Sequence, residues 1–236
     1  MRQFSIAHLA ALATLVLLCG LAIVVPRSHP GEWVERASCA LAAAIFAGWM
    51  GEYVAEVVAG TWTLEYGLPL QLTDAVSLAA IVALLTRRRL FIELLYFWAF
   101  SASLQATLTP DLGSTFPSVF YFTYFIYHVG VIVAACLLVF GCRLYPRRGA
   151  IWRVYLLTLA FTTLSGVGDV ITGGNYMYLA WKPTHASLLN HMGPWPWYIG
   201  AGVLVALVML AIVRAATAAL QRLVDGAQAP GHRRLR

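Results

Sequence analysis

Long apolar runs separated by short polar connectors occupy the chain almost from end to end. A helix that crosses a bilayer needs about 20 mostly apolar residues. Seven runs meet this requirement, at residues 4–25, 37–60, 68–86, 90–108, 118–140, 151–172 and 197–219. The expected fold class is therefore all-α, a polytopic bundle of about seven transmembrane helices that forms a single domain over residues 1–223.

The two ends of the chain need separate interpretation. The first run follows Arg2 as in a signal peptide, but its length and the lack of a small-residue cleavage motif before Pro26 favour an uncleaved helix. Residues 224–236 are polar and basic and contain Gly and Pro, which predicts a disordered cytoplasmic tail.

Composition supports the membrane class and excludes several others. The 236 residues are 61% hydrophobic and only 11% charged, against about 25% charged in soluble domains. The net charge of +6 is interpreted as arginine that directs topology, because no array of basic and aromatic residues indicates nucleic-acid binding. The four cysteines lie apart, without zinc-ligand spacing or a disulfide framework.

Among the connectors between the predicted helices, arginine occurs only in alternate ones. It occurs in 26–36, 87–89, 141–150 and the tail, whereas 61–67 and 109–117 contain no Lys or Arg and 173–196 contains only Lys182. By the positive-inside rule the N-terminus faces outward and the C-terminus inward, in a multi-pass protein of the cell membrane. Trp195 and Trp197 fit an aromatic belt at the outer interface.

Polar and ionisable side chains occur inside the predicted helices, where they are costly. With this orientation most of them lie in the outer half of the bundle, on five helices: Glu52, Glu56, Gln71, Thr73, Asp74, Gln105, Tyr124, His128 and Asp169. Since lipid offers no hydrogen bonds, these groups must face one another or water. The pattern predicts a polar cavity that opens toward the outer face.

Each of these residues also has a purely structural interpretation. The Thr73 hydroxyl is able to bond to the carbonyl four residues earlier, as membrane threonines often do. The two glutamates of the second helix would brace neighbouring helices, and His128 would be a satisfied buried histidine. Glu93, near the inner end, is expected to pair with the arginines at 87–89.

The cavity residues would support acyl chemistry. A hydroxyl nucleophile needs an adjacent base, and histidine serves that purpose near neutral pH. Thr73 is the candidate nucleophile and His128 the candidate base, with Asp74, Asp169 or Glu56 available to orient the imidazole. The same carboxylates would equally bind a cation or relay protons, so both interpretations stay open.

Three stretches resemble a known family. "QATLTPDL", "FPSVFYFTYFIYHVGVI" and "NYMYLAWKPTHASLLNHMGPWPWYI" look like the YwaF-like bacterial membrane proteins, which belong with eukaryotic transmembrane protein 164. The resemblance covers roughly residues 40 to 215. Its most specific part is the loop motif that includes Asn175, Tyr178, Lys182, Trp195 and Trp197.

The resemblance implies lipid chemistry. The eukaryotic relative is regarded as a phospholipid acyltransferase with a central cysteine and histidine, and more distant membrane hydrolases use threonine and histidine on fatty-acid esters. The histidine carries over onto His128 and the nucleophile onto Thr73 in "LPLQLTD". Relatives commonly read His-Leu-Cys where this chain reads Gln71-Leu72-Thr73, so a hydroxyl replaces a thiol here.

The leading hypothesis is thus an acyl-lipid hydrolase or acyltransferase that uses Thr73 and His128. The alternatives are an ion- or proton-coupled transporter that uses intramembrane carboxylates, and a catalytically silent membrane protein. The expected partners are membrane lipids, with no nucleic acid, no metal and no cofactor, and the oligomeric state is left open. Connector 173–196 would cap the cavity or contact a lipid headgroup.

Overall fold

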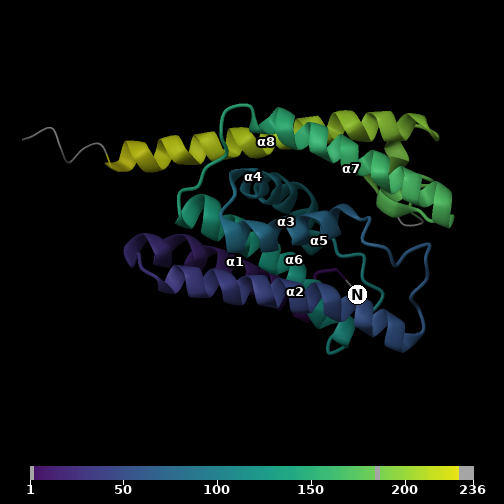
Figure 1. The fold of residues 1–236 in the computed structure, drawn as a ribbon, viewed down its shortest axis with the longest axis horizontal. Coiled ribbons are helices and arrows are strands. Elements are labelled where there is room, and N and C mark those ends of the chain that lie inside the picture. The colour runs from purple at the N-terminus through teal and green to yellow at the C-terminus, as the bar shows by residue number, and fades with distance from the viewer. Residues whose placement is uncertain (1–2, 184–186, 229–236) are drawn as a thin grey trace, which may run out of the picture.

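The computed structural model describes residues 3–183 and 187–228, and these form helices and connectors without a strand (Figure 1). The longer helices are α1 (Ile6–Ser28), α2 (Trp33–Ala59), α3 (Leu72–Thr86), α4 (Arg89–Trp98), α6 (Val119–Ala135), α7 (Ala150–Thr172) and α8 (Trp197–Gln228). Shorter segments are η1 (Ala99–Ser103), α5 (Leu104–Leu108), η2 (Cys136–Gly141), η3 (Tyr176–Tyr178) and η4 (Leu188–His191). The expected all-α membrane bundle is confirmed.

Six helical segments of the described chain are long and apolar enough to cross a bilayer, and α3 is a shorter apolar helix. Two of the six contain a π-helical segment: η1 lies between α4 and α5, and η2 forms the last part of the span that begins with α6. Such turns are rare and often occur at functional sites. The segment η1 also forms part of a cavity wall.

The third predicted span starts later than expected. Residues 68–71 are not helical, and α3 begins at Leu72 with Gln71 as its N-cap in extended conformation. Pro69 accounts for the difference, because proline disfavours helical geometry in the residue before it and lacks an N–H. Thr73 therefore lies in the first turn of its helix rather than inside a longer one.

The C-terminal helix is longer than predicted. Helix α8 runs to Gln228 instead of ending at 219, so the first part of the predicted tail is helical. Leucine, alanine and glutamine favour helix there, although Gly226 opposes it. The rest of the predicted disordered tail, residues 229–236, lies outside the described residues.

Helices α1 to α6 pack into one body, and α7 and α8 lie side by side across it (Figure 1). Helices α2 and α6 of the body approach each other closely. A Cβ atom at Gly130 would lie 2.8 Å from Cγ1 of Ile45, and one at Gly48 would lie 2.7 Å from Cγ2 of Ile126. These glycines let the two backbones approach, as small residues do in membrane helix packing.

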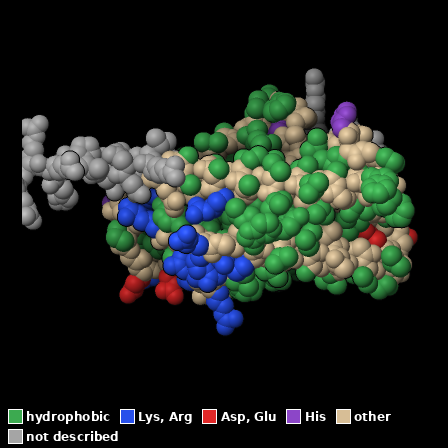
Figure 2. Space-filling model, turned by 90° about the horizontal axis from the view of Figure 1, so that it is seen from above, with side chains coloured by type: hydrophobic (Ala, Val, Ile, Leu, Met, Phe, Trp, Pro, Cys, Tyr) green, Lys and Arg blue, Asp and Glu red, His purple; other side chains and the backbone are tan. Residues whose placement is uncertain are grey.

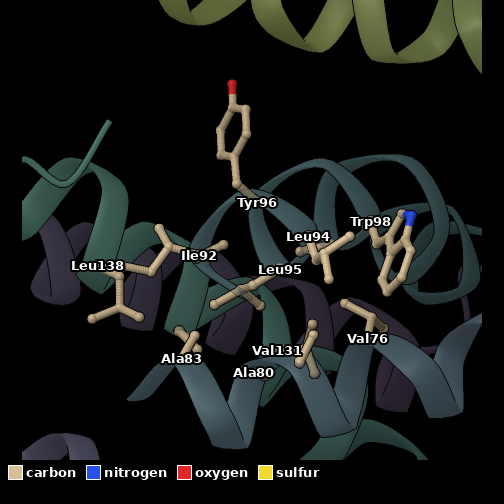
Figure 3. Packing of buried hydrophobic residues seen from close by; sticks show 14 of the residues in the cluster. Val76, Ala80, Ala83, Ile92, Leu94, Leu95, Tyr96, Trp98, Val131 and Leu138 are labelled. Carbon is tan, nitrogen blue, oxygen red and sulfur yellow. The ribbon is translucent and has the colours of Figure 1, made fainter. Parts of the chain in front are cut away.

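The core lies where α3, α4 and α6 meet (Figure 3). Ala80 and Ala83 on α3 are completely buried and leave room for Leu95 of α4. On the opposite side of α4, Tyr96 points toward α8, and its hydroxyl donates to the Val213 carbonyl at 2.9 Å. This bond joins the α7–α8 layer to the body.

Basic side chains gather at one end of the molecule (Figure 2). There Arg27 Nε donates to the Phe140 carbonyl at 2.9 Å, and Arg87 donates to Ser38 Oγ at 2.9 Å. Glu93 is an ion-pair partner as expected, and its partners are Arg147 and Arg153 rather than the neighbouring arginines at 87–89. Helix α4 turns Glu93 toward the α6–α7 connector, which brings both arginines to it.

We predict that the clustered arginines face the cytoplasm. In a variant without native cysteines, Thr63→Cys in connector 61–67 should react with an impermeant maleimide in intact cells. Ser28→Cys, in the arginine-bearing connector 26–36, should react only after permeabilisation. The opposite pattern would contradict the expected orientation.

The Glu93 cluster should respond asymmetrically to mutation. Its carboxylate is 1% exposed, whereas the Arg147 and Arg153 side chains are 51% and 38% exposed and are able to turn to water. Removing both arginines strands a buried charge, which typically costs about 3–5 kcal/mol. We expect Arg147→Ala with Arg153→Ala to lower the melting temperature in detergent more than Glu93→Gln, for which about 1–2 kcal/mol is expected. Equal shifts would contradict this interpretation.

Candidate functional site

A cavity of about 600 Å³ lies between the body and the α7–α8 layer. Its wall includes Thr73 from α3, Ser101 from η1, Gln105 from α5, and both Tyr124 and His128 from α6. The α8 helix and connector 173–196 complete it. The two predicted catalytic residues, which belong to different helices, therefore line one cavity.

Thr73 is in the first turn of α3, beside the N-cap residue. Within the described chain its hydroxyl forms no bond to the carbonyl four residues earlier, unlike Ser77, which donates to the Thr73 carbonyl at 2.8 Å. The first turn of a helix also leaves its N–H groups without intrahelical acceptors. Thr73 thus presents a hydroxyl beside unpaired backbone donors.

His128 is 2% exposed and is held between two aromatic rings. The ring centroids of Tyr124 and Tyr127 lie 4.3 Å and 4.2 Å from that of the imidazole. The Tyr124 hydroxyl donates to the Ala106 carbonyl at 2.8 Å, and the Tyr127 hydroxyl faces the Glu52 carboxylate. The Nδ1 atom of His128 is buried and has no hydrogen-bond partner among the described residues. The imidazole is therefore oriented by aromatic packing and not by a carboxylate.

Asp74, the neighbour of Thr73, turns away from the cavity. Its Oδ1 accepts from Trp49 Nε1 at 2.8 Å and from the Tyr53 hydroxyl at 2.9 Å, both on α2. Its Oδ2 accepts from the Gln71 N–H at 2.9 Å. The first two bonds hold the start of α3 against α2 and the third caps α3, so Asp74 has a structural role and does not contact His128.

Gln71 and Asp169 hold the connector that follows α7. The Gln71 side-chain oxygen accepts from the Met177 N–H at 2.9 Å, and Asp169 Oδ1 accepts from the Tyr176 N–H at 2.6 Å. Asp169 contributes to a separate hollow at the other side of α7. The predicted polar groups thus form two sets, one on the cavity wall and one that fastens the chain around it.

The described wall of the cavity includes none of the four carboxylates considered for ion transport, which are Glu52, Glu56, Asp74 and Asp169. Among the described residues, no three His, Cys, Asp or Glu side chains gather where they could hold a metal ion. The acidic residue that does line the cavity is Asp111.

The predicted loop motif has several roles. Asn175 closes its own loop, since its side chain bonds to the backbone of Ala180 and Trp181. Tyr178 lines the cavity, and its burial and the nearby Asp111 raise the pKa of its phenol.

Met177 and Tyr178 both adopt left-handed backbone conformations, with φ of 54° and 57°. This is a strained geometry for non-glycine residues, and such strain tends to cluster at functional sites.

The remaining loop residues lie farther from the wall. Lys182 is positioned over the Tyr198 ring, 5.3 Å from its centroid. Trp195 and Trp197 are largely exposed, as expected for side chains at a membrane interface. Pro183, Ser187 and Leu188 line the cavity, so the expectation that the connector caps the site agrees with the described residues.

Several wall residues carry no signal that sequence reasoning could use. Trp98 and Thr158 meet through a buried hydrogen bond of 2.8 Å between α4 and α7. Gly202 and Met209 lie in the part of α8, residues 199–213, whose sequence is apolar. Tyr127 could have been found, because it adjoins His128 in the sequence.

Comparison with known proteins gives one match. A model of the TMEM164 family matches residues 3–213. No curated protein and no solved structure matches the chain. The matched region extends from α1 into α8 and includes every wall residue of the cavity.

We predict that neighbouring residues 73 and 74 separate by role. Asp74→Ala leaves two buried donors on α2 without an acceptor, each at about 1–3 kcal/mol, and should clearly lower the melting temperature in detergent. Thr73→Ala should change the unfolding free energy by no more than about 0.5 kcal/mol. Comparable destabilisation by both variants would show that Thr73 is also a structural residue.

Proposed function

Because the chain belongs to the TMEM164 family, we propose that this membrane protein is an enzyme acting on acyl lipids, with Thr73 as nucleophile and His128 as general base. The observation that supports this most is the cavity shared by the Thr73 hydroxyl and the His128 imidazole. A hydroxyl nucleophile requires a base in the same water-poor space.

The proposed reaction proceeds in two halves. His128 takes the proton of Thr73 Oγ as Oγ attacks the carbonyl carbon of an acyl ester, which forms a tetrahedral oxyanion. When this collapses, the ester C–O bond breaks and the leaving alcohol receives the proton from His128. Water or a second alcohol then attacks the acyl-Thr73 ester by the same steps, giving hydrolysis or transfer.

The start of α3 supplies a second element of the proposed mechanism. Two N–H groups of its first turn, those of Leu72 and Thr73, form no hydrogen bond among the described residues, whereas those of Asp74 and Ala75 donate to the Gln71 carbonyl at 3.0 Å and 3.3 Å. The helix dipole places partial positive charge at this end of the helix. Backbone donors so arranged stabilise the oxyanion of acyl transfer, an effect often worth about 3–4 kcal/mol for one donor. Placing the nucleophile on the first turn brings the developing charge close to these donors.

The transporter alternative receives less support. It depends on carboxylates that face a pathway, whereas Asp74 and Asp169 accept hydrogen bonds from tryptophan, tyrosine and backbone donors. Glu52 faces the Tyr127 hydroxyl from behind the cavity wall. Ion-dependent flux in proteoliposomes, with no acyl-enzyme formed, would favour that alternative.

We predict that Thr73→Ala and His128→Ala each abolish covalent labelling by an alkyl fluorophosphonate while the protein stays folded. Thr86→Ala, at the opposite end of the same helix, is the matched control and should label as the wild type does. Thr73→Cys should form an acyl-enzyme with a p-nitrophenyl ester faster than wild type, because a thiol is the stronger nucleophile near neutral pH. Wild-type labelling and turnover in both alanine variants would refute the proposal.

A further inference from the structure

A second, smaller chamber of about 180 Å³ continues from the cavity along the seam between α7 and α8. The two spaces share part of their walls: Leu72, Thr158, Tyr178, Leu189, Gly202 and Ala206 line both. Beyond these, the chamber is bordered mainly by aliphatic side chains, including Leu159, Leu179, Ile199 and Val203. It is thus a side branch of the space that contains Thr73 and His128.

Most hydroxyl groups in the chamber wall already have partners, and among the described residues Thr162 is the exception. Tyr155 donates to the Val203 carbonyl at 3.3 Å, Tyr198 to the Tyr178 carbonyl at 2.7 Å, and Thr158 to the Val154 carbonyl at 2.8 Å. A buried water needs about three polar partners to be stable. With these donors used by the backbone, the chamber favours hydrocarbon over water.

Gly202 stands where the chamber meets the cavity. A Cβ atom added there would meet nothing within 4 Å, so the missing side chain leaves open space. Gly200, two residues earlier on α8, has equally open surroundings, but it is exposed and lines neither space. The two glycines therefore allow a matched comparison between filling the passage and adding the same bulk outside it.

We propose that this chamber binds the hydrocarbon tail of the acyl group, and that Gly202 and Ala206 determine how far the tail enters. The reacting carbonyl then lies in the cavity beside Thr73, and the tail passes Gly202 into the seam between α7 and α8. The position of the carbonyl rests on the proposed function. The binding of a tail does not, since it depends only on the apolar wall.

The test measures tail binding directly. Saturated fatty acids of increasing length displace dansyl-undecanoic acid from the full-length protein in micelles of one detergent. Because the tail gains packing contacts with the wall, each methylene that enters the chamber should strengthen displacement until the chamber is filled. Gly202→Leu should reduce the advantage of long over short chains at least tenfold, whereas Gly200→Leu should keep the wild-type profile. The same profile in all three proteins would overturn the chamber assignment.

Two further measurements keep the outcomes distinct. If Gly202→Leu does not fold, Gly202→Ala and Ala206→Val test the same passage with less bulk, and an unchanged profile in both would overturn the assignment. Tail binding is also measured in Thr73→Ala, where it should persist. A Gly202-dependent profile with normal fluorophosphonate labelling of Thr73→Ala would leave the chamber standing and reject the catalytic proposal. Loss of that labelling with a Gly202-independent profile would reject the chamber alone.

Discussion

The hydrogen bonds around the start of α3 are the constraint on which the candidate site depends. Asp74 holds this turn to α2, and the Ser165 hydroxyl donates to the Leu70 carbonyl at 2.8 Å from α7. The Tyr176 hydroxyl accepts a hydrogen bond from the Leu68 N–H at 3.0 Å and donates one to the Leu64 carbonyl at 2.6 Å. Non-helical backbone at membrane depth is tolerated only where protein or water satisfies it. These bonds satisfy backbone groups of residues 64–71 and fix Thr73 at the cavity.

The same constraint explains why so many polar residues in the bundle are not on the cavity wall. The break before Leu72 and the connector after α7 both leave backbone groups that need partners. Asp74 accepts from the Gln71 N–H, and Gln71, Asp169 and Asn175 bond to backbone groups of residues 176–181. The polar side chains of the described cavity wall come from several helices and connectors, and α6 alone supplies Tyr124, Tyr127 and His128. Two buried polar atoms of this wall, His128 Nδ1 and Ser187 Oγ, lack a partner among the described residues. An unmet buried group costs about 1–3 kcal/mol, and this favours a functional reason for keeping it.

Much of the site was predictable from residue type and helical periodicity. Thr73, Gln105, Tyr124 and His128 were assigned to one cavity, and the structure places all four on its wall. The roles of Asp74 and Asp169 were not predictable, because a carboxylate in the outer half of a helix has the same pattern whether it faces a cavity or a neighbouring helix. The late start of α3 follows from Pro69. The prediction began the helix at residue 68 because it gave more weight to the apolar run than to this proline.

The amino-acid sequence by itself determined the membrane class, the helices and the alternation of arginine between connectors, because these depend on hydropathy and charge along the chain. Only the tertiary structure decided which polar groups meet. Glu93 pairs with Arg147 and Arg153 rather than with its sequence neighbours, and Gly202 opens a passage on a helix that is apolar from residue 199 to residue 213. The physical reason is that helix packing sets the distances between side chains on different helices, and periodicity within one helix contains no information about its partner.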